Sequence, residues 1–284
     1  MAGTSGTPKA QTLGSRLKEA RLAAGYKTTR ELASRLKISH STISRWETGA
    51  RYPKPEDVAT ILAATGVNGA DRDKLLEMAR GTNDSHWLAV RSADRELQMA
   101  ALLEFEAKAS LITDVSPLLI PGLLQTREYT RAIMVAGGVP ESQVETRVTV
   151  RLGRRDALAR PNPVHLLALI GEPALYQLIG DPKVMRDQLT QVVTYAERPN
   201  VDVRVIPNAV NWNPSLDGPF VLVDSADEPS IVHLENRRAG LFFHESDDVE
   251  AYRRAAETVK EMAMSPADSQ VLIADIITRL ETTL

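Results

Sequence analysis

The sequence contains no cysteine among its 284 residues, so it forms neither disulfides nor thiolate metal sites. Long apolar runs are also missing, because none approaches the roughly 20 residues that a membrane helix needs. The first eleven residues, MAGTSGTPKAQ, lack the apolar core of a signal peptide. These absences point away from secreted and membrane proteins, and we expect a cytoplasmic protein with no membrane contact.

Motifs of enzyme chemistry are absent too: we find no nucleophile elbow, no phosphate-binding glycine loop and no His–Glu zinc motif. The five histidines, His40, His86, His165, His233 and His244, have no metal-site spacing. His165 and His233 fall in expected strands, where a hydrogen-bonded structural role is favoured over metal binding. We therefore expect no catalytic residue, no metal, no cofactor and no enzymatic activity.

Charge is divided unevenly along the chain. Residues 1–80 contain fourteen Lys and Arg against eight Asp and Glu, whereas the remaining residues contain 20 against 29. This pattern is expected of a protein in which only residues 1–80 bind a polyanion such as DNA. Chance surface charge is the alternative, and an excess of six charges does not exclude it.

The stretch TTRELASRLKISHSTISRWETG, residues 28–49, predicts two short helices around a tight turn. A threonine at its start can cap the first helix, and Ser39 or His40 opens the second. Gly49 closes the second helix because glycine accepts the positive φ that follows a helix end. Two helices on so short a link cross steeply, which is the geometry of a helix-turn-helix.

Each of these two helices has an apolar and a polar face. The residues expected to point inward are Leu32, Ala33, Ile38, Ile43 and Trp46. Those expected to point outward from the second helix are His40, Ser41, Ser44 and Arg45, with Thr42 at the edge. Short polar side chains with one forked cation suit a helix that enters a major groove and reads base edges. An ordinary helical hairpin with a polar surface is the alternative.

Three further helices, over residues 13–24, 56–65 and 71–79, complete a predicted domain of five short helices at residues 11–81. A basic, proline-stiffened loop, Ala50–Pro55, precedes the fourth helix. Residues 1–10 are expected to be a disordered lead, and Gly81–Asn83 marks the expected boundary.

The first domain resembles the helix-turn-helix domain of the Xre family, the relatives of phage repressors. The matching segments are LKEARLAAG, ELASRLKIS, STISRWETG and DVATILAATGV. The resemblance implies that three residues contact DNA bases: His40, Ser41 and Arg45. It implies that four others contact DNA phosphates: Thr29, Thr42, Arg51 and Lys54.

The same resemblance implies structural support for the DNA-binding surface. Arg21 and Glu47 match a pair that ties the first helix to the end of the third, with a solvent-exposed ion pair as the alternative. We interpret Trp46 as a core residue rather than one that stacks on bases. The chain departs from the family at Thr29, where glutamine is usual, and its link from Gly25 to Leu32 is one residue longer.

The remainder predicts a helical linker or dimerisation region at residues 82–162, then a mixed α/β domain at residues 163–284. Expected helices in the linker cover residues 84–111, 126–136 and 141–160. The last of these is rich in arginine: Arg147, Arg151, Arg154, Arg155 and Arg160. A solvated amphipathic helix is favoured here over a second nucleic-acid surface.

The α/β domain is expected to contain five strands, at residues 164–170, 201–206, 219–223, 230–234 and 241–243. Helices are expected at residues 173–179, 181–198, 247–264 and 265–280. The loop 208–219 holds Trp212 between two asparagines, Asn211 and Asn213. Trp212 could line a ligand pocket or plug a gap in the fold, and we favour the plug.

Residues 95–280 resemble the C-terminal domain of the WhiJ-like regulators of actinomycete bacteria. The segments that carry this resemblance are VSPLLIPGLLQTREYTRA, RLGRRDAL, VDVRVIP and GPFVLVD. It implies an antitoxin-like regulator that pairs with a small acidic partner protein.

We expect a dimeric transcription regulator that reads a palindromic site in double-stranded DNA, because one short recognition helix specifies too few base pairs alone. Its C-terminal domain would bind an unknown small-molecule effector or the partner protein. The alternatives are an antitoxin-like module that mainly regulates its own operon, and an enzyme that the first domain directs to DNA.

Overall fold

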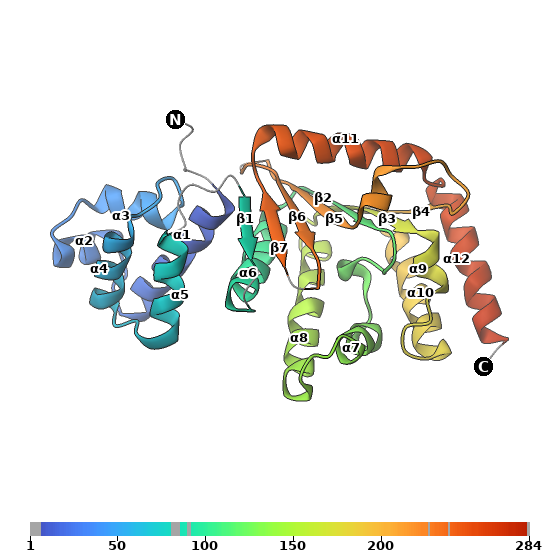
Figure 1. The fold of residues 1–284 in the computed structure, drawn as a ribbon, viewed down its shortest axis with the longest axis horizontal. Coiled ribbons are helices and arrows are strands. Elements are labelled where there is room, and N and C mark those ends of the chain that lie inside the picture. The colour runs from blue at the N-terminus through green and yellow to red at the C-terminus, as the bar shows by residue number, and fades with distance from the viewer. Residues whose placement is uncertain (1–6, 81–85, 90–91, 227, 238, 283–284) are drawn as a thin grey trace. The chain divides into compact units, whose positions relative to one another are not determined.

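The computed structural model describes residues 7–80, 86–89, 92–226, 228–237 and 239–282 (Figure 1). The chain divides into two compact units, described separately below. Unit 1 contains the chain up to residue 104 together with residues 227–246, and unit 2 contains residues 105–226 and 247–284. The predicted boundary at Gly81–Asn83 lies outside the described residues, as does most of the predicted disordered lead.

The first eighty residues form the five predicted helices. They are α1 (Pro8–Ala23), α2 (Thr29–Leu36), α3 (His40–Glu47), α4 (Pro55–Thr65) and α5 (Gly69–Arg80). Their fully buried centre includes Leu13, Leu17, Leu32, Ile43, Val58, Ile61 and Leu62. The lead was predicted to be disordered as far as residue 10, but α1 already begins at Pro8. Thr7 caps it by accepting a hydrogen bond from Ala10 N at 3.1 Å, and proline suits the first helical position.

Unit 1 also contains strands β1 (His86–Ala89), β6 (Ile231–Glu235) and β7 (Gly240–Phe243), antiparallel in the order β1-β7-β6. Helix α6 (Ser92–Lys108) follows β1. The single helix predicted over residues 84–111 is therefore wrong at both ends. Residues 86–89 form β1 instead, which pairs with β7, and Leu111 begins a strand in the sheet of unit 2. Pairing with distant strands therefore outweighs the helical periodicity at both ends.

Unit 2 is built on four strands in the order β5-β2-β3-β4. They are β2 (Leu111–Ser116), β3 (His165–Gly171), β4 (Val201–Ile206) and β5 (Phe220–Asp224). Strands β2, β3 and β4 are parallel, and β5 is antiparallel to β2. Residues 166–170 of β3 are buried on both faces, as expected for an interior strand of a parallel sheet. Assigning residues 82–162 to a helical region missed β2, which lies between β3 and β5.

Six helices belong mainly to unit 2: α7 (Arg127–Ala136), α8 (Glu141–Gly153), α9 (Glu172–Tyr176), α10 (Pro182–Ala196), α11 (Ser246–Met262) and α12 (Pro266–Glu281). Short 3₁₀ turns cover Gly122–Leu124, Arg154–Leu158 and Pro214–Asp217. Thr126, Asp181 and Ser265 cap α7, α10 and α12, as their sequence positions predict. The fold class of a helical first domain followed by a mixed α/β domain is thus confirmed.

The arginine-rich stretch is an amphipathic surface helix only over α8, so the predicted solvated helix is wrong after Gly153. Arg154 is buried and binds Glu106 through Nε–Oε2 at 2.8 Å and Nη2–Oε1 at 2.5 Å. Arg155 donates to the carbonyl of Gln125, and Arg160 donates to that of Ala109 at 2.8 Å. These contacts tie loops and helix ends together, and only Arg147 remains fully on the surface.

Candidate nucleic-acid interface

Helix α3 has an exposed polar face and a buried apolar face. Its cap residue Ser39 and the side chains of His40, Ser41 and Arg45 are exposed, whereas Thr42 and Ser44 are half-buried. On the opposite face Ile43 is fully buried, and Trp46 is 5% exposed. The predicted base-contacting residues therefore lie together on one surface, and Trp46 is a core residue as predicted.

Ile38 is the exception among the residues expected to point inward, since it is 36% exposed. Lys37 ends α2 in the left-handed conformation, with φ 55° and ψ 40°, which non-glycine residues seldom adopt. The turn lets Ile38 N donate to the carbonyl of Ala33 at 3.1 Å and leaves the Ile38 side chain at the surface. Nothing in the sequence around Lys37 indicates this conformation, because glycine or asparagine is usual there.

Hydrogen bonds between side chains and backbone order the first turn of α3. The Ser39 hydroxyl accepts a bond from Ser41 N at 3.3 Å and lies 2.8 Å from the Ser41 hydroxyl. Arg45 Nε donates to the carbonyl of Ser41 at 3.3 Å, which lays the side chain back along the helix. The terminal nitrogens of Arg45 have no partner among the described residues, so they are available to a ligand.

The N-terminus of α2 is capped by side-chain hydrogen bonds. Thr28 and Glu31 form a capping box, with Glu31 N donating to the Thr28 hydroxyl at 3.3 Å and Thr28 N donating to Glu31 Oε2 at 3.4 Å. Thr28 is thus the cap, and Thr29 is the first helical residue, half-buried.

The loop between α3 and α4 carries the other two predicted phosphate contacts, Arg51 and Lys54, both exposed. Arg51 N donates to the carbonyl of Arg45 at 3.0 Å, and Lys54 N donates to Asp57 Oδ2 at 3.2 Å. Between them the Tyr52 hydroxyl donates to the carbonyl of Met78, and burial raises the pKa of Tyr52, which keeps this donor protonated. The loop backbone is therefore fixed while its two cations face solvent.

Cations without acidic partners gather in this part of the chain. Seven exposed cations of residues 27–54 have no carboxylate within ion-pair distance among the described residues: Lys27, Arg30, Arg35, Lys37, Arg45, Arg51 and Lys54. The only acids in that range are engaged, Glu31 in the capping box and Glu47 with Arg21. The site prediction named three of these cations and missed Lys27, Arg30, Arg35 and Lys37. A charge count over this shorter window would have found them.

Three predictions for the rest of the chain can be compared with the structure. Trp212 is 62% exposed, so it does not plug the fold; Asn213 and Ser215 beside it are buried instead. His233 is buried against Phe242, with ring centres 4.6 Å apart, as a structural residue should be. His165 is exposed, so its predicted structural role is wrong.

Over the described ranges, no group of three or more His, Cys, Asp and Glu side chains is arranged to hold a metal ion. None of the helices in those ranges is long and apolar enough to cross a membrane.

Comparison with known families agrees with the two-part architecture. Residues 12–75 match a family model described as a helix-turn-helix domain, which is consistent with DNA binding and transcription regulation. Residues 99–275 match a family model described as a domain of unknown function, DUF5753. Neither a curated protein nor a solved structure matches the chain. Because the second match covers more than half of the chain, the protein belongs to the DUF5753 family, here preceded by a helix-turn-helix domain.

Proposed function

We propose that the chain is a sequence-specific DNA-binding transcriptional regulator of the Xre type. The observation that carries this proposal is the exposed face of α3, where His40, Ser41 and Arg45 meet solvent while the opposite face is buried. A helix held in this way can enter a major groove without losing its packing, and its side chains match the donors and acceptors that base edges present.

The contacts divide into two kinds. Arg45, Ser41 and His40 read bases, and Arg45 swings away from the Ser41 carbonyl so that its forked donors reach guanine. Phosphate contacts come from Thr29, Thr42, Arg51 and Lys54, and they set the position of α3 along the duplex without reading sequence. The other unpaired cations of residues 27–54 add sequence-independent attraction to DNA.

The regulator acts as a homodimer on a palindromic operator. Helix α3 has only eight residues, and the few base pairs it reads cannot define a site among genomic competitors. Two copies related by a twofold axis read two half-sites about one helical turn apart, roughly 34–36 Å.

The C-terminal domain binds a signal or a partner and carries no catalytic role in this proposal. Its resemblance to WhiJ-like regulators supports a small acidic partner protein, in which case the chain is antitoxin-like and regulates its own operon. Trp212 and Leu216, 62% and 65% exposed on a loop that Asn213 fixes through Ser215, favour contact with a protein.

Selection from a pool of random duplexes tests the proposal. The full-length chain should enrich a palindrome whose half-sites are separated by about ten base pairs. A variant with His40, Ser41 and Arg45 all replaced by alanine should retain weak, salt-sensitive binding and enrich nothing. If the unchanged protein binds DNA without enriching any sequence, the proposal of sequence-specific regulation fails.

A further inference from the structure

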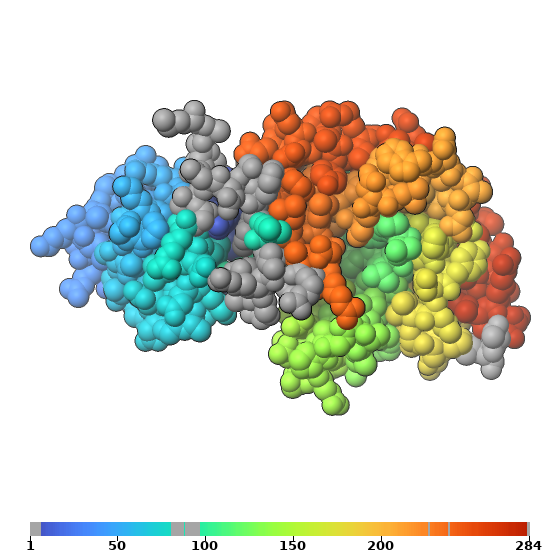
Figure 2. All heavy atoms as spheres, viewed as in Figure 1, coloured from blue at the N-terminus to red at the C-terminus, as the bar shows by residue number. Residues whose placement is uncertain are grey.

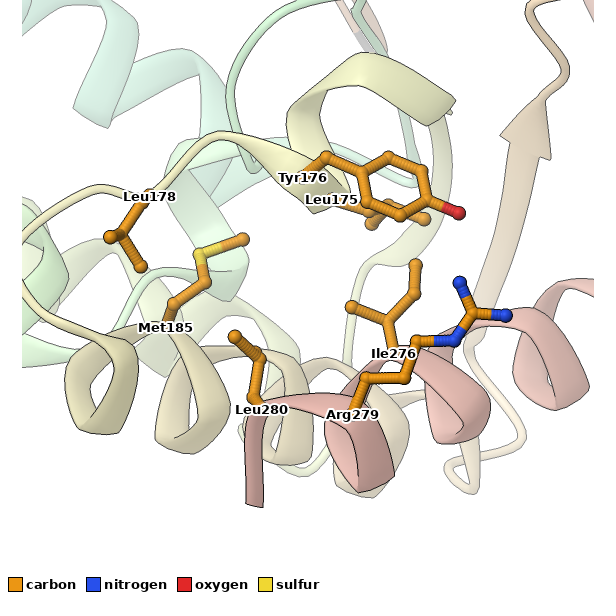
Figure 3. A pocket seen from close by; sticks show the side chains of 7 residues that line it. All are labelled: Leu175, Tyr176, Leu178, Met185, Ile276, Arg279 and Leu280. Atoms are coloured by element: carbon orange, nitrogen blue, oxygen red, sulfur yellow. The ribbon is translucent and has the colours of Figure 1, made fainter. Parts of the chain in front are cut away.

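Unit 2 has a shallow hollow beside its C-terminal helix, shown in Figure 3 and referred to below as the α12 hollow. Its apolar lining consists of Leu175, Leu178, Met185, Ile276 and Leu280, and Tyr176 and Arg279 complete it. The hollow has a volume of about 140 Å³ and is open on one side. An apolar cavity of about 150 Å³ is large enough to hold benzene, so the α12 hollow is the size of one small ring or branched alkyl group.

The position of the α12 hollow in the fold favours ligand binding. Helix α9, which supplies part of the lining, directly follows β3, so it lies where the parallel strands have their carboxyl ends. The segments after these strands are joined there, since Asn208 N donates to Glu172 Oε2 at 2.8 Å. Gly171 makes room for its neighbour, because a Cβ at this position would lie 2.1 Å from the carbonyl oxygen of Pro117. Open α/β sheets bind ligands outside this edge.

The α12 hollow has a fixed floor and an exposed rim. Leu175 and Met185 are each 1% exposed and Ile276 is 3% exposed, so the protein core holds them in place. Tyr176 and Leu178 at the rim are 49% and 55% exposed. An apolar group that covered them would be stabilised by removing this surface from water.

The two ends of the α12 hollow differ in chemistry. In Figure 3 the Tyr176 hydroxyl and the Arg279 guanidinium lie at one end, whereas Leu178 and Met185 lie at the other. A guanidinium offers forked donors that match the two oxygens of a carboxylate, and a nearby hydroxyl can donate as well. One end is therefore suited to an anionic head and the other to an apolar tail.

We propose that the α12 hollow binds a small monocarboxylic acid with an apolar tail the size of a phenyl ring or a branched alkyl chain. Arg279 and Tyr176 hold the carboxylate, and Leu178, Met185 and Leu280 surround the tail. This acid would be the signal of the C-terminal domain, so its regulatory role rests on the proposed function, whereas its binding does not.

Calorimetric titration of the full-length chain tests the proposal with phenylacetate as the probe. Two matched compounds divide its chemistry: 2-phenylethanol keeps the ring without the charge, and acetate keeps the charge without the ring. Phenylacetate should bind saturably with a dissociation constant of about 1 mM, and the affinity of each matched compound should be lower by a factor of about ten or more. Equal binding of phenylacetate and 2-phenylethanol would remove the anionic part of the proposal, and no saturable binding would end it.

Two variants place the binding at the α12 hollow. Arg279→Gln should weaken phenylacetate about tenfold and leave 2-phenylethanol unchanged. Leu178→Glu, at an exposed position, should repel the acid, and the matched control Val271→Glu, at a 64% exposed position of α12 outside the lining, should not. If neither Arg279→Gln nor Leu178→Glu weakens phenylacetate, the acid binds elsewhere and the proposal fails.

A free acid and the carboxyl end of a protein share this chemistry, so the peptide Gly-Gly-Phe forms a further arm of the titration. Binding of the peptide more than tenfold tighter than phenylacetate would assign the α12 hollow to a protein end and overturn the small acid. Because calorimetry requires no DNA, failure here leaves the DNA-binding function untouched, and failure to enrich an operator leaves the ligand result standing.

Discussion

Arg21 of α1 donates two parallel hydrogen bonds to Glu47, the last residue of α3: Nε–Oε1 at 2.6 Å and Nη2–Oε2 at 2.9 Å. Arg21 Nη1 also donates to the carbonyl of Tyr26 at 2.7 Å. The two side chains are 5% and 6% exposed, so the pair is buried rather than solvent-exposed. The hydrogen bonds to Glu47 raise the pKa of Arg21. This pair fixes the end of the recognition helix against α1.

Replacing Glu47 by glutamine should destabilise the first domain strongly. The change leaves the Arg21 charge buried without a counter-charge, which typically costs about 3–5 kcal/mol. Hydrogen exchange of the α1 and α3 amides measures the local free energy of unfolding. Glu19→Gln is the control, because it breaks an exposed pair with Arg16 that is worth about 1 kcal/mol or less. If Glu47→Gln and Glu19→Gln lower the free energy of unfolding by similar amounts, the Arg21–Glu47 pair stabilises the domain no more than an exposed ion pair does.

Gly14→Ala should separate α1 from α3. A Cβ at residue 14 would lie 2.3 Å from the carbonyl oxygen of Trp46 and 2.8 Å from that of Glu47, so backbone must move. Overpacking of this kind costs about 1–3 kcal/mol, and thermal unfolding should register it. Gly153→Ala at the end of α8 is the control, since nothing lies within 4 Å of its added Cβ. If Gly14→Ala melts like the unchanged protein, the close helix contact does not exist in solution.

Lys54→Ala should weaken DNA binding on all sequences alike. Loss of one phosphate contact should reduce the slope of log K against log salt concentration by about one unit per monomer. Binding titrations at several salt concentrations measure this slope, with Lys183→Ala, an exposed lysine of α10, as the control. An unchanged slope for Lys54→Ala would remove this residue from the phosphate contacts.

Asp114 should make the stability of unit 2 depend on pH. Burial raises the pKa of Asp114 from 3.8 to about 6, and the nearby Glu106 adds to the rise. The Ser116 hydroxyl, which donates to Asp114 at 2.6 Å, lowers the pKa, as do Arg154 and Arg151, but burial outweighs them. Because the folded pKa is above the unfolded one, the folded chain holds a proton that the unfolded chain has lost. Stability should therefore fall as pH rises from about 4 to about 6, by an amount on the order of 2–3 kcal/mol.

Asp114→Asn removes the titrating group and should flatten this part of the stability curve. Urea denaturation between pH 4 and pH 7 measures it, and Asp217→Asn, which changes an exposed carboxylate, serves as the control. Parallel curves for Asp114→Asn and the unchanged chain would show that folding does not raise the pKa of Asp114.

Local signals made the first domain predictable from sequence. Thr28 caps α2 as one of the two threonines expected to do so, Gly49 has a φ of 69°, and Pro55 opens α4. These features depend on residues within one or two turns of each other, so they can be read along the chain. Lys37 shows the limit, because it adopts the left-handed conformation although a lysine side chain has no preference for it.

Predictions failed where a segment is held by distant parts of the chain. No strand is predicted at residues 111–116, because β2 is held by pairing with β3 more than fifty residues later and with β5 about one hundred residues later. The sequence pattern places Arg154 on the surface of an amphipathic helix, but in the structure it forms a buried ion pair with Glu106. The α12 hollow combines α9, α10 and α12, which no pattern along the chain connects.

The central claim is that the exposed face of α3 reads base pairs, and a titration of Arg45→Ala tests it most directly. The selected operator should be compared with duplexes that carry single base changes in a half-site. We predict that Arg45→Ala costs about 1–3 kcal/mol on the operator and removes the preference at one base pair per half-site, while the other positions keep theirs. Equal loss on every duplex, with all base preferences intact, would contradict the claim.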